Sequence, residues 1–553
     1  MHKINIVMKK SAKIISQAAV GFIFTLFAMI IFTACWGNEN EKPSLNYGGV
    51  FNVNITSPVE TLDPNKINYS SDLFASLPVY EGLVRTGKDF DSVEPLLAES
   101  WEKLDGGKKF IFHLRKNVKF HNDPCFENEN ERKFSAYDVL FTFKRIANRN
   151  SPGINYYLFA DIISGMRQFH RGKTENINGI KIIDSLTIEF NLAKPYVVFL
   201  KLLASPSAYI LSERAVEYYG NEFEKRAIGT GPFKLSFWNP TEELFFIKNK
   251  DYWRRDKRGS RLPFLDAVSF KILPLPDFRI TDFLKGKCDF ITLNRIDYKA
   301  AIKTVCTANF RVRKMRRHFN VRFFGFSFDK NTRLAKDKNL RKAIAYAFDR
   351  NKIFNSPDFR FSPAETLTPL PLLGIAKADW YGFEPAKGLS LVKKLKSIKE
   401  KYLIYTSVNT PAVKELEKGM RKLGLNARVE VHPRRYYKEI VKRRPDIFRV
   451  SMTPSFPDPT DYYSMFYSKS GRQTNLFDYS NPEFDRIYEK SLIEQNKQKR
   501  RKLFLRLEKI LRDDVAALYF STSGEMYNFI SDRVENFSMR NTFPNFSVIR
   551  LKK

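Results

Sequence analysis

Cysteine is scarce in this chain, with four residues among 553. The cysteines that follow Cys35 are Cys125, Cys288 and Cys306, and this odd set permits at most one internal disulfide. Cys288 with Cys306 is the easier pair, because the two lie near each other in the sequence. A disulfide-rich scaffold is excluded, so the stability of the chain has to come from its hydrophobic core.

Histidine and the short catalytic motifs are equally sparse. The six histidines are scattered, and no Gly-x-Ser-x-Gly elbow, Walker-type phosphate loop or His-Glu-x-x-His zinc pair occurs. His121 and Cys125 are spaced like metal ligands, but the residues between them are typical of a loop. We therefore predict a protein that is not an enzyme and needs no metal or cofactor. A secreted hydrolase whose triad assembles only in the folded chain stays an alternative.

Acidic residues are too few to balance the bases, and the formal net charge is +34. Such an excess often indicates nucleic acid or anionic membrane surfaces as partners. Here the bases form short, dispersed clusters without a nucleic-acid-binding signature. These clusters are Arg313-Lys314 with Arg316-Arg317, Lys442–Arg444, and Lys499–Lys502. We predict a solvated basic surface that can lie near anionic lipid headgroups, and no specific nucleic-acid partner.

The N-terminal residues differ from the rest of the chain. Four lysines precede residue 14, no charge occurs over residues 14–34, and that run ends in Phe32-Thr33-Ala34-Cys35. A basic start, an apolar stretch and small residues before a cleavage site are typical of a secretory signal. Cys35 then resembles the acylated cysteine of a bacterial lipobox. Residues 1–34 are predicted to be a lipoprotein signal peptide and residues 35–46 a polar tether.

A plain transmembrane anchor is the alternative, since the uncharged run is long enough to span a bilayer. Either anchor places the body of the protein outside the cytoplasm.

The body mixes strands and helices. Residues 49–55, 108–115 and 186–192 alternate between apolar and polar residues, as half-buried strands do. Ser135 with Asp138 three residues later predicts a capping box at a helix start. Apolar residues at helical spacing predict two more helices, over residues 338–349 and around Leu503–Leu511. With 553 residues, two or three mixed α/β domains are expected.

Several stretches, taken together, resemble the family 5 bacterial solute-binding proteins, the oligopeptide, dipeptide and nickel group. Their order and spacing, over about residues 49–520, carry the resemblance more than any single motif. The stretches are Thr61-Leu62-Asp63-Pro64, Val79–Leu83, Pro95–Trp101, Phe110–Phe120, Ser135–Val139, Gly229–Phe233, Asn249–Trp253, Leu340–Asp349, Phe456–Pro459 and Asn481–Asp485.

The resemblance implies an α/β, two-lobed periplasmic-binding-protein-like fold of type II, in the large three-domain cluster C form, with a hinged cleft. Lobe I would hold residues 47–82, 209–320 and 526–553. An inserted domain would span residues 83–208, and lobe II residues 321–525. Hinged closure around a buried solute is a known transition in such binders.

The resemblance also implies where a peptide would bind. Aligned on Pro457-Asp458-Pro459, the family's tryptophan is Met452 and its amino-gripping aspartate is Ser455. A neutral hydroxyl loses the charge-assisted part of that contact, worth about 1 kcal/mol or more. A second family position, where some members place an acid, is Asn68. The loss of both acids favours an acidic, N-blocked or cell-wall peptide. The predicted ligand-binding residues are Asn68, Tyr69, Tyr156, Tyr157, Ser451, Met452, Thr453, Ser455, Phe456 and Asp458.

The predicted function is that of a lipid-anchored, monomeric substrate-binding protein that delivers a peptide-like solute to the permease of an ABC importer. Two alternatives stay open. The same fold could bind a nickel complex, haem or a sugar-like solute. The chain could also be a basic, adhesin-like surface lipoprotein, which salt-sensitive binding to polyanions would reveal.

Overall fold

The computed structural model describes most of the chain beyond residue 48. The described residues are 49–67, 69–87, 92–150, 155–304, 310–315, 319–355, 362–364, 366–369, 372, 381–395, 401–432, 436–472, 474–522, 525–540 and 543–552. The predicted signal peptide, Cys35, the tether and Asn68 lie outside this range. Within it, no helix is both long and apolar enough to span a bilayer.

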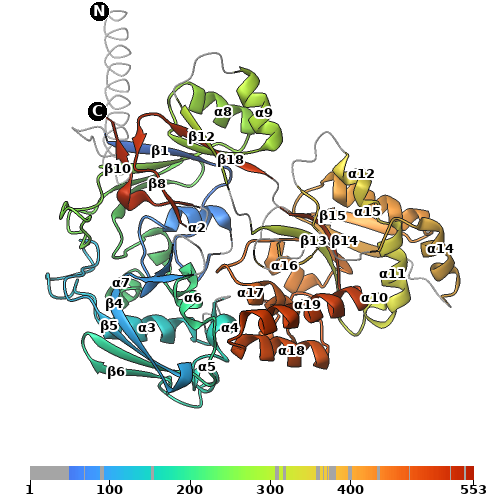
Figure 1. Ribbon diagram of the computed structural model, residues 1–553, viewed down its shortest axis with the longest axis horizontal. Helices are drawn as coiled ribbons and strands as arrows, with labels where there is room; N and C mark the ends of the chain where they lie inside the picture. The colour runs from blue at the N-terminus through green and yellow to red at the C-terminus, as the bar shows by residue number, and fades with distance from the viewer. Residues whose placement is uncertain are drawn as a thin grey trace, which may run out of the picture.

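Three larger sheets organise the molecule (Figure 1). A seven-stranded sheet has the order β12-β18-β11-β1-β10-β9-β8. Its strands come from three distant parts of the chain. In sheet order they are β12 (Phe310–Lys314), β18 (Met526–Ser531), β11 (Phe290–Asn294), β1 (Val50–Ile55), β10 (Ala267–Ile272), β9 (Glu243–Lys248) and β8 (Phe233–Asn239). We call the part of the molecule built on this sheet lobe I.

Lobe I carries helices on both sides of its sheet. Helices α8 (Pro276–Leu284) and α9 (Arg295–Thr304) contact β11. Helix α2 (Ser70–Ser76) lies below the sheet in Figure 1, and α7 (Glu213–Tyr219) contacts α3 (Ala136–Ile146) of the inserted domain. Short strand pairs complete the C-terminal end, β19 (Val534–Glu535) with β22 (Arg550–Leu551) and β20 (Met539–Arg540) with β21 (Phe543–Pro544).

A four-stranded sheet, β4-β5-β7-β6, forms the inserted domain. Its core is continuous with that of lobe I. The strands are β4 (Ala98–Leu104), β5 (Lys109–Leu114), β6 (Ile180–Asp184) and β7 (Thr187–Asn191), and the pair β2 (Val84–Thr86) with β3 (Val93–Pro95) precedes them. The helices are α3 (Ala136–Ile146), α4 (Tyr156–Phe159), α5 (Met166–His170) and α6 (Phe199–Leu203).

A five-stranded sheet, β15-β14-β16-β13-β17, forms lobe II. Separate apolar clusters cover its two faces. The strands are β13 (Val321–Phe326), β14 (Tyr402–Thr406), β15 (Ala427–Val431), β16 (Ile447–Met452) and β17 (Ala517–Thr522). The helices are α10 (Arg333–Lys336), α11 (Lys338–Ala347), α12 (Arg350–Phe354), α14 (Pro385–Lys393), α15 (Pro411–Lys422), α16 (Tyr436–Arg443), α17 (Pro459–Tyr463), α18 (Pro482–Ile493) and α19 (Lys497–Asp513).

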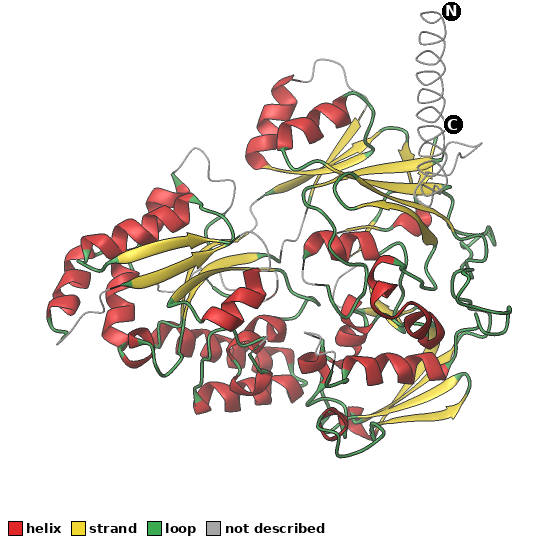
Figure 2. Ribbon diagram, turned by 180° about the vertical axis from the view of Figure 1, so that it is seen from behind, coloured by secondary structure: helices red, strands yellow, loops and turns green. Residues whose placement is uncertain are grey.

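The chain passes between the lobes twice, and the strands that flank the two passages are paired. One leads from β12 to β13 and the other from β17 to β18. In lobe II, β13 pairs with β17, and in lobe I, β12 pairs with β18, so the same two chain segments are antiparallel partners on both sides. Two views from opposite sides show lobe II meeting the inserted domain well away from these strands (Figures 1 and 2).

The predicted strands and helices are confirmed, with one shorter helix. The capping box between Ser135 and Asp138 is present. The helix predicted over residues 338–349 ends at Ala347, because Phe348 takes an extended conformation and packs its ring against Phe324. Asp349 instead caps the next helix by accepting a hydrogen bond from the Lys352 amide.

The predicted disulfide is not supported. Cys288 is a buried free thiol, and its sulfur lies 3.2 Å from the carbonyl oxygen of Phe290. Burial raises the pKa of this thiol to about 12, so it stays protonated. Cys125 is also buried and free, and Cys306 lies outside the described residues.

The Gly229–Phe233 motif has a structural role. A Cβ atom at Gly229 would lie 2.1 Å from the carbonyl oxygen of Val79, and one at Gly231 would lie 2.5 Å from it. Only glycine allows these two backbone segments to approach so closely. The Gly231 amide donates to Val79 at 2.8 Å, which fixes β8 against the loop that leads into the inserted domain.

Candidate functional site

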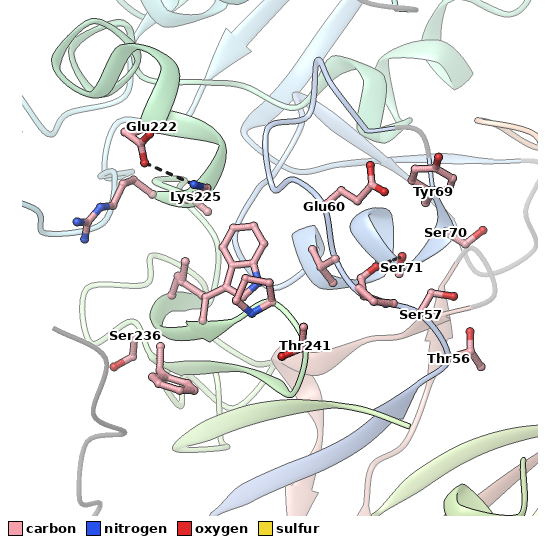
Figure 3. A pocket seen from close by; sticks show the side chains of 18 of the residues that line it. Thr56, Ser57, Glu60, Tyr69, Ser70, Ser71, Glu222, Lys225, Ser236 and Thr241 are labelled. Atoms are coloured by element: carbon pink, nitrogen blue, oxygen red, sulfur yellow. Dashed lines mark hydrogen bonds and ion pairs between the residues drawn. The ribbon is translucent and has the colours of Figure 1, made fainter. Parts of the chain in front are cut away.

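A cavity of about 1410 Å³ lies between the lobes, and we call it the cleft. Most of its described wall belongs to lobe I, namely residues 56–60, 69–71, 225–228 and 235–238. Lobe II contributes Arg322 and Ser451. Figure 3 shows the lobe I side chains, including Glu60, Tyr69 and the serines that follow, around this space. The volume is ample for a small solute, and both lobes border it.

The lobe I wall carries an acid that sequence reasoning missed. Glu60 is exposed in the cleft, and its amide donates to Asp72 Oδ1 at 2.8 Å, which fixes the backbone there. Burial, and then the negative Glu60, raise the pKa of Tyr69. Burial also raises the pKa of Asp72 to about 6. Glu60 belongs to no recognised sequence motif, so only the folded structure shows that it lines the cleft.

The lobe II wall carries two arginines on neighbouring strands. In the antiparallel pair β13 and β16, Arg322 is opposite Ser451 and Phe324 is opposite Arg449. Side chains two residues apart on a strand share a face, so both arginines project from the same face of the sheet. Arg322 lines the cleft, and Arg449 lies behind it.

Both arginines are half-buried next to like charge. Burial, and then the positive Arg449, lower the pKa of Arg322 to about 9. Burial lowers the pKa of Arg449 as well, and its Nε makes no hydrogen bond within the described part of the chain. Two neighbouring, half-buried cations repel each other, and an anion beside them would offset that cost. Sequence reasoning named neither arginine.

Ser451 and its neighbours are held in place by polar contacts. The Asn320 side-chain amide donates to Ser451 Oγ at 3.2 Å and to Thr453 Oγ1 at 3.0 Å. The Tyr437 hydroxyl donates to the Ser451 carbonyl at 3.2 Å. Of the predicted ligand-binding residues, Tyr69 and Ser451 line the cleft. Thr453 is exposed beside it.

Met452, Ser455 and Phe456 do not line the cleft. Met452 packs against the apolar cluster of lobe II. The Ser455 amide donates to the buried carboxylate of Asp461. Phe456 is 4% exposed and belongs to the apolar cluster of lobe I and the inserted domain. Contact of these three residues with a ligand therefore stays a prediction.

Asp458 has a structural role. It caps α17 by accepting a hydrogen bond from the Thr460 amide. Its two oxygens receive a forked pair of hydrogen bonds from Arg500, at 2.8 and 2.6 Å. Burial disfavours the carboxylate, but Arg500 outweighs that cost and holds the pKa of Asp458 well below its usual range.

The two predicted tyrosines of the inserted domain also lie outside the cleft lining. Tyr156 is buried, and its ring stacks on His170 at a centroid distance of 3.9 Å. Tyr157 lines a separate cavity of about 50 Å³ between the inserted domain and lobe II. Among the described residues, no group of three or more histidine, cysteine or acidic side chains is placed to hold a metal ion.

Comparisons with known proteins agree with this architecture. The family model of the bacterial extracellular solute-binding proteins, family 5 Middle, matches residues 92–474. A dipeptide-binding protein of Pseudomonas aeruginosa is 27% identical over 526 residues, which cover 87% of this chain and 91% of that protein. Heme-binding protein A of Haemophilus influenzae is 28% identical over 327 residues, 57% of this chain and 54% of that protein.

A solved structure shows the same fold. The periplasmic binding protein DppA from Helicobacter pylori, in complex with the peptide STSA, superimposes with a TM-score of 0.78 at 22% identity. The match covers 92% of this chain and 99% of that protein. The predicted two-lobed α/β fold is therefore confirmed.

Proposed function

This chain belongs to the bacterial extracellular solute-binding proteins of family 5, and from that premise we propose that it captures a peptide in the cleft and delivers it to the permease of an ABC importer. The observation that carries the proposal is the cleft between the two lobes, with Arg322 lining its lobe II side and Arg449 on the neighbouring strand. A ligand enclosed there loses its water, which strengthens every charged contact it makes.

Arg322 and Arg449 favour a ligand that carries a carboxylate. Arg322 lines the cleft, and Arg449 on the next strand adds positive charge behind it. A carboxylate accepts two parallel hydrogen bonds from a guanidinium, and this geometry gives direction as well as energy. We therefore propose that the carboxyl end, or an acidic side chain, of the peptide faces lobe II.

This chain has a serine at position 455, where the family resemblance implies an aspartate that would bind the amino end of the peptide. Ser455 is neutral, and its amide is already bound by Asp461. For this reason we propose that acidic, N-blocked or cell-wall peptides bind better than short cationic ones. Tyr69 and Ser451 are the predicted residues we place at the ligand.

The location and the partners form part of the same proposal. Residues 1–34 would be removed, Cys35 would carry the lipid, and the monomeric body would work outside the cytoplasm. The membrane would be contacted through this anchor, and the permease would recognise the ligand-loaded form.

The proposal is tested by affinity measurements on the purified body. Matched peptides would be compared as free acids and as C-terminal amides, and with free or acetylated amino ends. We expect the free acid to bind more tightly than the amide, and the acetylated peptide to bind at least as tightly as the peptide with a free amino end. Equal affinity for acid and amide would refute the carboxylate contact. Mass spectrometry of solutes that co-purify with the protein would identify the natural ligand.

Haem is the second candidate, because a relative carries that name and because haem has two carboxylate groups that would suit the same arginines. Spectroscopic titration with haem separates the two. A Soret shift at equimolar haem, together with no response to peptides, would favour haem.

A further inference from the structure

The inserted domain and lobe II share a second contact, separate from the cleft. The Val197 amide donates to the Leu492 carbonyl at 3.0 Å, and the Gln495 side chain donates to the Pro195 carbonyl at 3.3 Å. In Figure 1 this contact lies where α4 and α6 meet α17 and α18, well away from the paired strands that link the lobes. We call it the distal contact, and its main members are Tyr157, Val197, Lys201, Phe456, Asp458 and Leu492.

Apolar packing makes the distal contact tight. Phe456 comes from lobe II, yet its side chain is buried in the cluster shared by lobe I and the inserted domain. Leu492 of lobe II packs against the same cluster. At Gly471, a Cβ atom would lie 2.4 Å from the Tyr157 ring, so the two domains meet there without space for a side chain. The cavity that remains measures only about 50 Å³.

An ion pair also joins the two sides of the distal contact. The forked pair of Asp458 and Arg500 lies within lobe II. Lys201, on α6 of the inserted domain, places its Nζ 3.6 Å from Asp458 Oδ2. The Asp458 side chain is 2% exposed and that of Lys201 is 19% exposed, so the pair is poorly screened by water. If the halves separated, Asp458 would lose this cation and Phe456 its apolar surroundings.

We propose that the distal contact holds the two halves together before any ligand binds, so that Lys201 and Phe456 set ligand affinity without touching the ligand. They are positioning residues for the cleft. A hinged binder exchanges between open and closed forms, and a contact made only in the closed form raises its population. The measured affinity falls in proportion to the population that is competent to hold the ligand.

The first test needs no ligand and is therefore independent of the proposed function. Lys201→Met and Phe456→Ser would be compared with the unchanged protein by small-angle scattering and by amide hydrogen exchange. We expect a larger radius of gyration in both variants and faster exchange at Val197, with circular dichroism unchanged. Lys201→Arg keeps the charge and should restore the compact form. Lys181→Met and Phe278→Ser remove an exposed lysine and an exposed phenylalanine and serve as matched controls.

The second test rests on the proposed function and follows a bound acidic peptide by stopped flow. We expect its dissociation rate to rise roughly tenfold in Lys201→Met, with a smaller change in the association rate. Phe456→Ser should likewise raise the dissociation rate more than it changes the association rate. If Phe456→Ser does not fold, Lys201→Met and its arginine counterpart carry the test alone.

Two outcomes would overturn the proposal. One is a radius of gyration and exchange rate at Val197 that stay the same in all variants. The other is a peptide dissociation rate that stays the same in variants that are expanded. Failure of every peptide to bind would refute the proposed function and leave the scattering result to decide on the distal contact.

Discussion

The two places where the halves of this molecule meet are built in opposite ways. The cleft is roomy, and its lobe II side places Arg322 beside Arg449. The distal contact is almost filled and brings Lys201 and Arg500 to Asp458. An open surface with neighbouring like charges is suited to a ligand of opposite charge, whereas a filled surface with an ion pair across it is suited to holding protein against protein.

The largest expected effect comes from breaking the charge balance of the distal contact. Asp458→Asn leaves Arg500 buried without its carboxylate, and we expect the free energy of unfolding to fall by about 3–5 kcal/mol. Urea denaturation measures this value. Asp532→Asn, which breaks an exposed pair with Arg311, should cost less than about 1 kcal/mol. Equal losses in the two variants would contradict the contrast.

A second prediction concerns Glu508, a buried acid on α19. It accepts a hydrogen bond from the Tyr463 hydroxyl at 2.9 Å and one from the Leu367 amide. Burial raises the pKa of Glu508 to about 7, so the folded chain holds a proton that the unfolded chain releases near pH 4.5. Its stabilising effect is complete below pH 4.5 and is lost as the pH rises through 7.

Glu508→Gln removes this dependence. Between pH 4.5 and 7 the unchanged protein should lose about 3 kcal/mol of stability relative to the variant, since one pKa unit corresponds to about 1.4 kcal/mol. Urea denaturation at several pH values measures the difference between the two proteins. If the stability of the two proteins depended on pH in the same way, the pKa of Glu508 would be the same in the folded and unfolded chains, which would contradict the prediction.

The third prediction concerns Arg322→Met, a substitution that changes the cleft and leaves the distal contact intact. Arg322→Met should weaken binding of a free-acid peptide roughly 30-fold, about 2 kcal/mol, and leave binding of its amide unchanged. Calorimetric titration gives both values. Thermal stability should not fall, because one of two half-buried like charges is removed. Lys225→Met, on the opposite wall and close to Glu222, is the control and should change the acid-to-amide ratio little.

The smallest effect on ligand binding is expected from a substitution at Ser455, where the family resemblance implies an aspartate. Ser455→Asp should change the preference for a free amino end less than about twofold, because Asp461 already holds the backbone amide of this residue and the side chain does not line the cleft. Calorimetric titration with free and acetylated peptides measures the ratio. A clear gain for the free amine would place residue 455 at the ligand.

The sequence predicted the fold better than the site. Alternation in residues 49–55 and the box at Ser135 are local patterns, and local patterns decide strands and helix starts. The cleft depends on which strands become neighbours. Arg322 and Arg449 lie 127 positions apart and come together only through the pairing of β13 with β16.

The family motif around Asp458 predicted a segment at the ligand, and that contact stays a prediction. The structure adds a packing role that the motif did not show. The apolar Phe456 and the paired Asp458 face the inserted domain, and no periodicity in a single sequence shows which of two surfaces such residues meet.

The paired strands beside the two passages have a mechanical consequence. Because β12 and β18 are partners in one sheet while β13 and β17 are partners in the next, an antiparallel strand pair flanks the link on each side. A strand pair bends more readily across its flat side than it shears along its strands, so we expect the halves to swing about one axis and slide little. A protease that cut one of the strands would leave the other to tether both halves.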